Sequence, residues 1–256
     1  LGSVIAGPWA QGIVFSGFMI VGLLEFYRMC DRLSFIHVSK EMGLFIGLFI
    51  YLLLIGMSIG SLPIISITVI FPLFFSLILV ELWKKHPQPL LNIALLVLGI
   101  IYVVIPFYLS IDLNIRNNQF LPTVAGMLIL IWTNDTMAYF VGKKWGKTKL
   151  AASISPGKSW EGVFGGLGCV LMVFCIVKGF GLLDHFETHF QFKLFFSVIF
   201  LMGMSVVGDL FESLLKRLAG QKDSSQLLPG HGGVLDRLDA LLPTLPIAAV
   251  LLQLLR

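Results

Sequence analysis

The chain has few charged residues. Asp, Glu, Lys and Arg make up only 12% of it, whereas about 25% is usual for a soluble globular domain. So few charges cannot cover a water-exposed surface, which excludes a soluble globular protein. The mean hydropathy of +0.93 agrees with this. We therefore expect an integral membrane protein embedded in a lipid bilayer, and no nucleic-acid partner.

Cysteines and polar linkers are also scarce. The three cysteines, Cys30, Cys169 and Cys175, lie in or beside apolar segments without metal-ligand spacing, so neither a zinc site nor a disulfide framework is expected. No polar, Ser-rich or Pro-rich linker interrupts the hydrophobic pattern, which predicts a single membrane domain over 1–256. We divide it into N-terminal helices (1–120) and C-terminal helices (121–256), the latter with loops at 142–160 and 216–238.

Long apolar segments are abundant. A helix of about 20 apolar residues spans a bilayer, and by that measure the sequence contains about eight such helices. The predicted fold class is therefore all-α, a polytopic membrane protein. The expected spans are approximately 8–27, 42–60, 62–83, 90–110, 120–141, 161–181, 192–215 and 238–255.

Basic residues are distributed unevenly between these spans. Of the 18 Lys and Arg residues, all but Arg116, Lys178, Lys193 and Arg256 fall in or next to the loops after spans one, three, five and seven. Because Lys and Arg favour the cytoplasmic side of a membrane, these loops are predicted to be cytoplasmic. The expected location is the inner (plasma) membrane of the cell.

Ionisable residues gather at the cytoplasmic end of the seventh span. Asp209, Glu212, Ser213 and Lys216 recur at helical spacing and share one helix face. The helix dipole alone explains Lys216 and Arg217. It does not explain Asp209, which directly follows an apolar run, where a carboxylate costs about 2.5 to 3.5 kcal/mol near a helix centre. We therefore expect Asp209 to have a chemical role.

Two further acids lie where the last span begins. Asp236 and Asp239 share a face of that helix, although the helix dipole also favours acids at a helix start. With Asp209 they suit a hard cation, because magnesium takes oxygen ligands, commonly one or two carboxylates plus substrate phosphates. We predict Mg²⁺ bound by Asp209, Asp236 and Asp239, and leave open a second cation.

A glycine-rich segment, PGHGG at 229–233, precedes these acids. Glycine adopts positive φ and lets the backbone approach a phosphate closely. A plain turn explains such a segment equally well when it stands alone. Its position between acids and bases favours a substrate site that includes His231, Gly232 and Gly233.

The charged stretch from Ser213 to Asp239 resembles the signature of the phosphatidate cytidylyltransferase family, the CDP-diacylglycerol synthases. The resemblance extends to NDTMAYFVGKKWGKTKL at 134–150, to SPGKSWEG at 155–162 and to EFYRM at 25–29. Gly157 stands where the family commonly has a second lysine. The signature positions are filled by Ser213, Lys216, Arg217, Lys222, Asp223, Pro229, His231, Gly232, Gly233, Asp236, Arg237 and Asp239.

The resemblance implies a homodimeric enzyme of phospholipid biosynthesis that condenses CTP with phosphatidic acid to CDP-diacylglycerol and pyrophosphate. The chemistry suits these residues. A phosphate monoester has a second pKa of about 6, so the lipid phosphate is largely dianionic near pH 7 and needs no general base. The obstacle is repulsion between two polyanions, which positioning and charge neutralisation must overcome.

The expected roles follow from this chemistry. Lys216, Arg217, Lys222 and Arg237 neutralise phosphates, and Asp223 orients one of these bases. Ser155 and Pro156 are expected as N-cap and first residue of the sixth helix, whose N-terminus receives an anion together with Lys158. The remaining residues expected at the substrate are Asp135, Ser155, Lys158, Ser213, His231, Gly232 and Gly233.

Other functions fit the sequence less well. A cation-coupled transporter would carry its acids near the bilayer midplane, often in repeated halves, whereas here they lie at one boundary. A CTP-dependent polyprenol kinase would have similar hydropathy and substrates but would release CDP. Two acids outside the signature, Glu25 and Glu81, are expected to pair with Arg28 and Lys84 at span ends.

Overall fold

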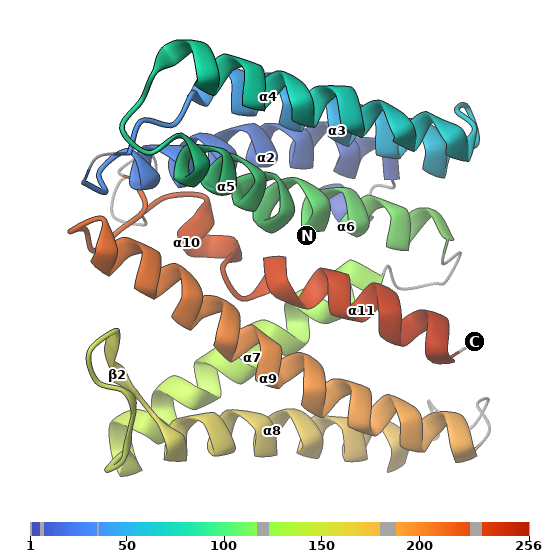
Figure 1. Cartoon of the computed structure of the whole chain (residues 1–256). Helices are drawn as coiled ribbons and strands as arrows, with labels where there is room; N and C mark the ends of the chain where they lie inside the picture. Colours follow the sequence, from blue (N-terminus) through green and yellow to red (C-terminus); the bar gives the residue numbers. More distant parts are fainter. Residues whose placement is uncertain are drawn as a thin grey trace. The chain divides into compact units, whose positions relative to one another are not determined.

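The computed structural model describes residues 2–5, 8–34, 36–116, 123–179, 188–225 and 232–255. Helices dominate it, and a helix overlaps each expected span (Figure 1). The all-α prediction for a polytopic membrane protein is confirmed, with one two-stranded hairpin as an addition. Within the described ranges, six helices are long and apolar enough to cross a membrane: Trp9–Cys30, Lys40–Ser58, Ile64–Lys84, Pro89–Ile115, Val124–Trp145 and Gln191–Leu218.

The chain forms two compact units. Unit 1 comprises Leu1–Val124 and Leu215–Leu238, and unit 2 comprises Ala125–Leu214 and Asp239–Arg256. The described parts of the loop predicted at 216–238 therefore fold with the N-terminal helices, although in sequence the loop lies between the C-terminal helices α9 and α11.

Unit 1 is a bundle in which α2, α3, α4 and α5 run side by side (Figure 1). Tyr27 of α2 is fully buried and donates its hydroxyl to the Leu96 carbonyl at 2.9 Å. Side chains at Gly43 and Gly99 would collide with its ring, so these glycines allow close packing. The elements are α1 (Gly2–Ile5), α2 (Pro8–Cys30), α3 (Lys40–Ser58), the 3₁₀ helix η1 (Ile64–Val69), α4 (Ile70–Lys84), α5 (Pro89–Gly99), the π-helical η2 (Ile100–Val104), α6 (Ile105–Arg116) and α10 (Leu235–Leu238).

Unit 2 is built on long helices and a hairpin. The hairpin strands are antiparallel, with Lys149 opposite Ser159. Gly166 lets α8 approach α7, because a Cβ there would lie 2.6 Å from the Asn134 carbonyl oxygen. The elements are α7 (Thr123–Trp145), β1 (Lys149–Ala151), β2 (Ser155–Ser159), α8 (Trp160–Gly179), α9 (Thr188–Leu218), whose last turn belongs to unit 1, and α11 (Leu241–Leu255).

The start of α8 differs from the prediction. Ser155 and Pro156 are not its N-cap and first residue, because both lie in β2 and the helix begins at Trp160. Pairing with β1 commits this backbone to an extended conformation until Ser159. Ser159 caps the helix instead, since its Oγ accepts the Gly162 N–H at 3.2 Å.

Candidate active site

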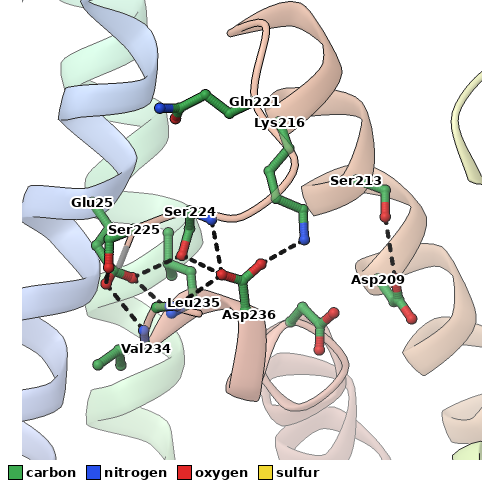
Figure 2. Close-up of polar contacts among 12 residues, drawn as sticks. Glu25, Asp209, Ser213, Lys216, Gln221, Ser224, Ser225, Val234, Leu235 and Asp236 are labelled. Carbon is green, nitrogen blue, oxygen red and sulfur yellow. Dashed lines mark hydrogen bonds and ion pairs between the residues drawn. The ribbon is translucent and has the colours of Figure 1, made fainter. Parts of the chain in front are cut away.

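One acidic cluster lies in unit 2, where α7, β2 and α9 each contribute a side chain. Lys158 of β2 pairs with Asp209 of α9 at 2.5 Å. Asp135 of α7 lies within electrostatic reach of both. Ser213, one turn after Asp209, donates its Oγ to Asp209 Oδ1 at 3.3 Å (Figure 2). The structure thus brings together four site residues predicted from three separate segments.

A glycine brings the start of the last helical segment close to this cluster. Gly208 directly precedes Asp209, and a Cβ on it would lie 2.5 Å from the Asp239 carbonyl oxygen and 2.1 Å from Pro243 Cγ. The backbone of Asp239 therefore packs against the turn of α9 that carries Asp209. Asp239 also accepts the Ala240 N–H through Oδ1 at 2.7 Å. Two of the three predicted metal ligands are thus neighbours in unit 2.

The loop predicted at 216–238, which we call the signature loop, lies in unit 1 and begins with the last turn of α9. The Gln221 N–H donates to the Lys216 carbonyl at 2.8 Å, and the Gly220 N–H donates to the Arg217 carbonyl at 3.1 Å. Gly220 has φ +68°, a left-handed conformation that glycine adopts readily. This turn ends the helix directly after its basic residues and turns the chain into the loop.

Asp236 is the centre of a hydrogen-bond network in unit 1 (Figure 2). Its Oδ1 accepts Lys216 Nζ at 2.6 Å. Its Oδ2 accepts the Ser224 N–H, the Ser224 hydroxyl and the Gly233 N–H, each at 2.8 Å. Gly232 has φ +81°, and a Cβ there would lie 2.8 Å from Oδ2. The structure thus brings together four of the predicted site residues: Lys216, Gly232, Gly233 and Asp236.

The same contacts set the charge of Asp236. Burial alone would raise its pKa, but Lys216 and the donors on Gly233 and Ser224 outweigh that effect and hold the pKa below its usual range. Asp236 is therefore an anion at neutral pH.

The other predicted site residues lie at the surface of unit 1, in β2 or outside the described residues. Arg217, Lys222, Asp223 and Arg237 are exposed at the surface of unit 1, and Arg217 Nη1 donates to the Gln221 carbonyl at 3.4 Å. Ser155 is half-buried in β2. His231 lies outside the described residues.

Glu25 has a role that its sequence context did not predict. This α2 side chain is 1% exposed, whereas Arg28, its expected partner, is exposed. Glu25 instead accepts four hydrogen bonds from the signature segment (Figure 2). The only signal in the sequence was its place in the EFYRM motif. Glu81 also differs from expectation, since it contacts His86 Nδ1 at 2.9 Å and Asn92 Nδ2 at 3.0 Å.

The carboxylates differ in how well they suit a metal. Among the residues that the structure describes, no three Asp, Glu, His or Cys side chains lie close enough to form a complete metal site. Magnesium commonly needs only one or two, with waters and substrate phosphates completing its shell. Asp209 fits, because its side chain is 30% exposed and contacts one lysine and one hydroxyl. Asp236 already accepts four donors, so its role as a ligand stays a prediction.

The chain is similar to known proteins along most of its length. Residues 1–255 match the cytidylyltransferase family. The phosphatidate cytidylyltransferases of Pseudomonas aeruginosa and Haemophilus influenzae are 46% and 49% identical over 50% and 47% of this chain, which spans 46% and 42% of their length. That of Rickettsia prowazekii is 35% identical over 77% of this chain and 90% of its own. The chain belongs to the cytidylyltransferase family.

Proposed function

We propose that this protein transfers the cytidylyl group of CTP to phosphatidic acid, giving CDP-diacylglycerol and pyrophosphate. The observation that carries the proposal is the signature itself: Lys216 at the end of α9 shares one hydrogen-bond network with Gly233 and Asp236. The names of the relatives support the same reaction, since each is a phosphatidate cytidylyltransferase.

The reaction requires charge control more than proton transfer. An oxygen of the lipid phosphate attacks the α-phosphorus of CTP, the bond from that phosphorus to the bridging oxygen breaks, and pyrophosphate leaves with the bond electrons. Because the attacking phosphate is already dianionic near pH 7, no side chain has to remove a proton. The chain must instead hold two anions together.

Two lysines can neutralise the charge of these anions. Lys158 and Lys216 each pair with an aspartate, at 2.5 and 2.6 Å, so each ammonium group has a fixed position before any phosphate arrives. Preorganised charge of this kind needs little reorganisation during the reaction. The proposal adds contacts to the phosphates from basic side chains exposed in unit 1: Arg217, Lys222 and Arg237, with Asp223 orienting one of them.

We include magnesium in the proposal, with Asp209 and Asp239 of unit 2 as its protein ligands. When bound, the metal would neutralise phosphate charge and stabilise the leaving pyrophosphate. Asp135 lies close enough to Asp209 to add to the negative potential there. We also propose a second cation and Asp236 as a third protein ligand. Substrate contacts are proposed for Ser155, Ser213 and His231.

We also propose an inner-membrane location and a homodimer. The apolar helices support a multi-pass membrane protein, and the basic loops favour an inner-membrane orientation with 142–160 and 216–238 in the cytoplasm, where CTP and magnesium are available. A homodimer is proposed from the family resemblance alone. Native mass spectrometry of the protein released from lipid nanodiscs measures the number of chains directly.

Purified protein in nanodiscs tests the reaction. With CTP, phosphatidic acid and Mg²⁺, we expect equal amounts of pyrophosphate and a cytidine-bearing lipid, and neither product when phosphatidic acid is left out. Release of CDP would instead identify a CTP-dependent lipid kinase. Absence of turnover in protein that remains folded would contradict the proposal.

A further inference from the structure

Glu25 connects the two ends of the signature loop. Ser224 and Ser225 precede the segment 226–231, and Val234 and Leu235 follow it. Oε1 accepts the Ser225 hydroxyl at 2.6 Å and the Val234 N–H at 3.0 Å. Oε2 accepts the Ser224 hydroxyl at 3.2 Å and the Leu235 N–H at 2.9 Å. Each carboxylate oxygen therefore takes one donor from each end of the segment.

These donors are hydroxyls and backbone amides, and all four are uncharged. A carboxylate that is 1% exposed is costly unless hydrogen bonds replace its water. A buried pair with a lysine would neutralise charge. Bonds to backbone N–H groups instead fix the path of the main chain, which is the function that this arrangement serves.

We call these four hydrogen bonds of Glu25 the clamp. The hydrogen-bond network extends from the clamp to Asp236. The Ser224 hydroxyl lies 2.8 Å from Asp236 Oδ2 as well as 3.2 Å from Glu25 Oε2. A hydroxyl has one proton, so it donates to one carboxylate at a time and connects the two. Gly233 lies between them: its N–H donates to Asp236, and a Cβ on it would lie 2.5 Å from Glu25 Oε1. Through Ser224 and Gly233, Glu25 therefore constrains the position of Asp236 and of its partner Lys216.

We propose that Glu25 of α2 is a positioning residue, which closes the two ends of the signature loop and thereby holds Asp236 and Lys216 in their working arrangement. Its effect on catalysis rests on the proposed function. Its effect on loop structure does not.

Hydrogen exchange of Glu25→Gln tests the clamp without turnover. Glutamine keeps one acceptor oxygen but turns an NH₂ group toward donors, so at least one buried donor loses its partner. We expect amides within 222–238 to exchange about tenfold faster, as the loss of a hydrogen bond to a charged group allows. Amides of α4 and α5 should be unchanged.

Glu81→Gln is the matched control. Glu81 also lies in unit 1 and is 2% exposed, but it contacts His86 and Asn92, outside the signature. Its variant should loosen the segment around α4 and α5 and leave 222–238 unchanged. Unchanged exchange of 222–238 in Glu25→Gln, or the same faster exchange in Glu81→Gln, would overturn the proposal.

Turnover then separates positioning from general stability. In Glu25→Gln, we expect kcat for CDP-diacylglycerol formation to fall about tenfold or more, with the KM for CTP changed less than about threefold. Equal loss of kcat in both glutamate variants would contradict positioning. Absence of activity in the wild-type protein would refute the proposed function, while the exchange result would still decide the clamp.

A milder variant keeps the test decisive if Glu25→Gln does not fold. Ser225→Ala removes one donor, at 2.6 Å from Oε1, and leaves the carboxylate in place. We expect faster exchange in 222–238 from it as well, by a smaller factor. No change there would overturn the clamp.

Discussion

The two acidic clusters differ in what satisfies their carboxylates. In unit 1, Asp236 and Glu25 accept backbone amides and hydroxyls from the signature loop, together with one lysine. In unit 2, Asp209 contacts a lysine and a hydroxyl. A carboxylate can accept about four hydrogen bonds. Asp236 has three donors of its own and shares the Ser224 hydroxyl with Glu25, whereas Asp209 contacts only two donors and retains more capacity. The first arrangement fixes a backbone, and the second leaves room for a cation.

The largest expected effect is on Asp209, the residue with spare capacity. Asp209→Asn should lower kcat at least about 100-fold, the scale found when one preorganised electrostatic group is removed. Excess Mg²⁺ should not restore the activity. The measurement is CDP-diacylglycerol formation in nanodiscs.

Asp31→Asn is the control for that prediction. Asp31 forms an ion pair with Lys40 at 2.5 Å and is 24% exposed, close to the values for Lys158 and Asp209. It lies in unit 1, where it also accepts the Val38 N–H at 2.8 Å. We expect activity within about threefold of wild type, because a solvent-exposed pair contributes little. Equal losses in both variants would remove the distinction between the clusters.

Gly208→Ala probes the packing beside Asp209. The new Cβ would lie 2.1 Å from Pro243 Cγ and 2.5 Å from the Asp239 carbonyl oxygen, whereas at Gly203 of the same helix nothing lies within 4 Å. We expect Gly208→Ala to lower the free energy of unfolding by about 1 to 3 kcal/mol. Gly203→Ala should be neutral or stabilising by up to about 1 kcal/mol. Thermal unfolding in detergent compares the two, and similar melting temperatures would contradict the close contact.

Asp236 should make stability depend on pH. Its folded-state pKa lies below the usual value, so the unfolded state binds the proton first as the pH falls. Its contribution is therefore complete above the unfolded pKa of about 4 and declines below it, through the folded pKa. The melting temperature of Asp236→Asn should be lower than that of wild type by about 2 to 4 °C near pH 7. This difference should shrink below about pH 4, and a constant difference would contradict the assignment.

The smallest expected effect is that of Ser213→Ala. Its hydroxyl donates to Asp209 over 3.3 Å, a long hydrogen bond, and Asp209 keeps its pairing with Lys158. Loss of one such bond is worth about 0.5 to 1.5 kcal/mol, so we expect kcat to fall about two- to tenfold. A loss as large as that of Asp209→Asn would give Ser213 a direct role with substrate.

The membrane helices could be predicted because lipid imposes a simple rule: a helix that crosses it needs about 20 predominantly apolar residues in succession. The cluster of Asp209 and Ser213 could be predicted too, since residues four apart share a face of any helix. The pairing of Lys158 with Asp209 could not, because it depends on how a short hairpin folds back before α8. The same hairpin explains why Ser155 and Pro156 are not the helix start.

The role of Glu25 could not be predicted from the sequence, for a different reason. Its donors are about 200 residues away in the chain, with separations of 199 to 210. No local pattern reports such a contact, and a glutamate three residues before an arginine resembles an ordinary helix pair. Its burial reveals its role only once α2 is placed against the signature loop.

The fate of the phosphates of CTP tests the central claim most directly. Nanodiscs containing phosphatidic acid are supplied with Mg²⁺ and CTP labelled with ³²P at either the α or the γ position, and the lipid fraction is counted. The account predicts that α-label enters the lipid and that γ-label leaves as pyrophosphate. Transfer of γ-label to the lipid, or no label from either position, would contradict cytidylyl transfer.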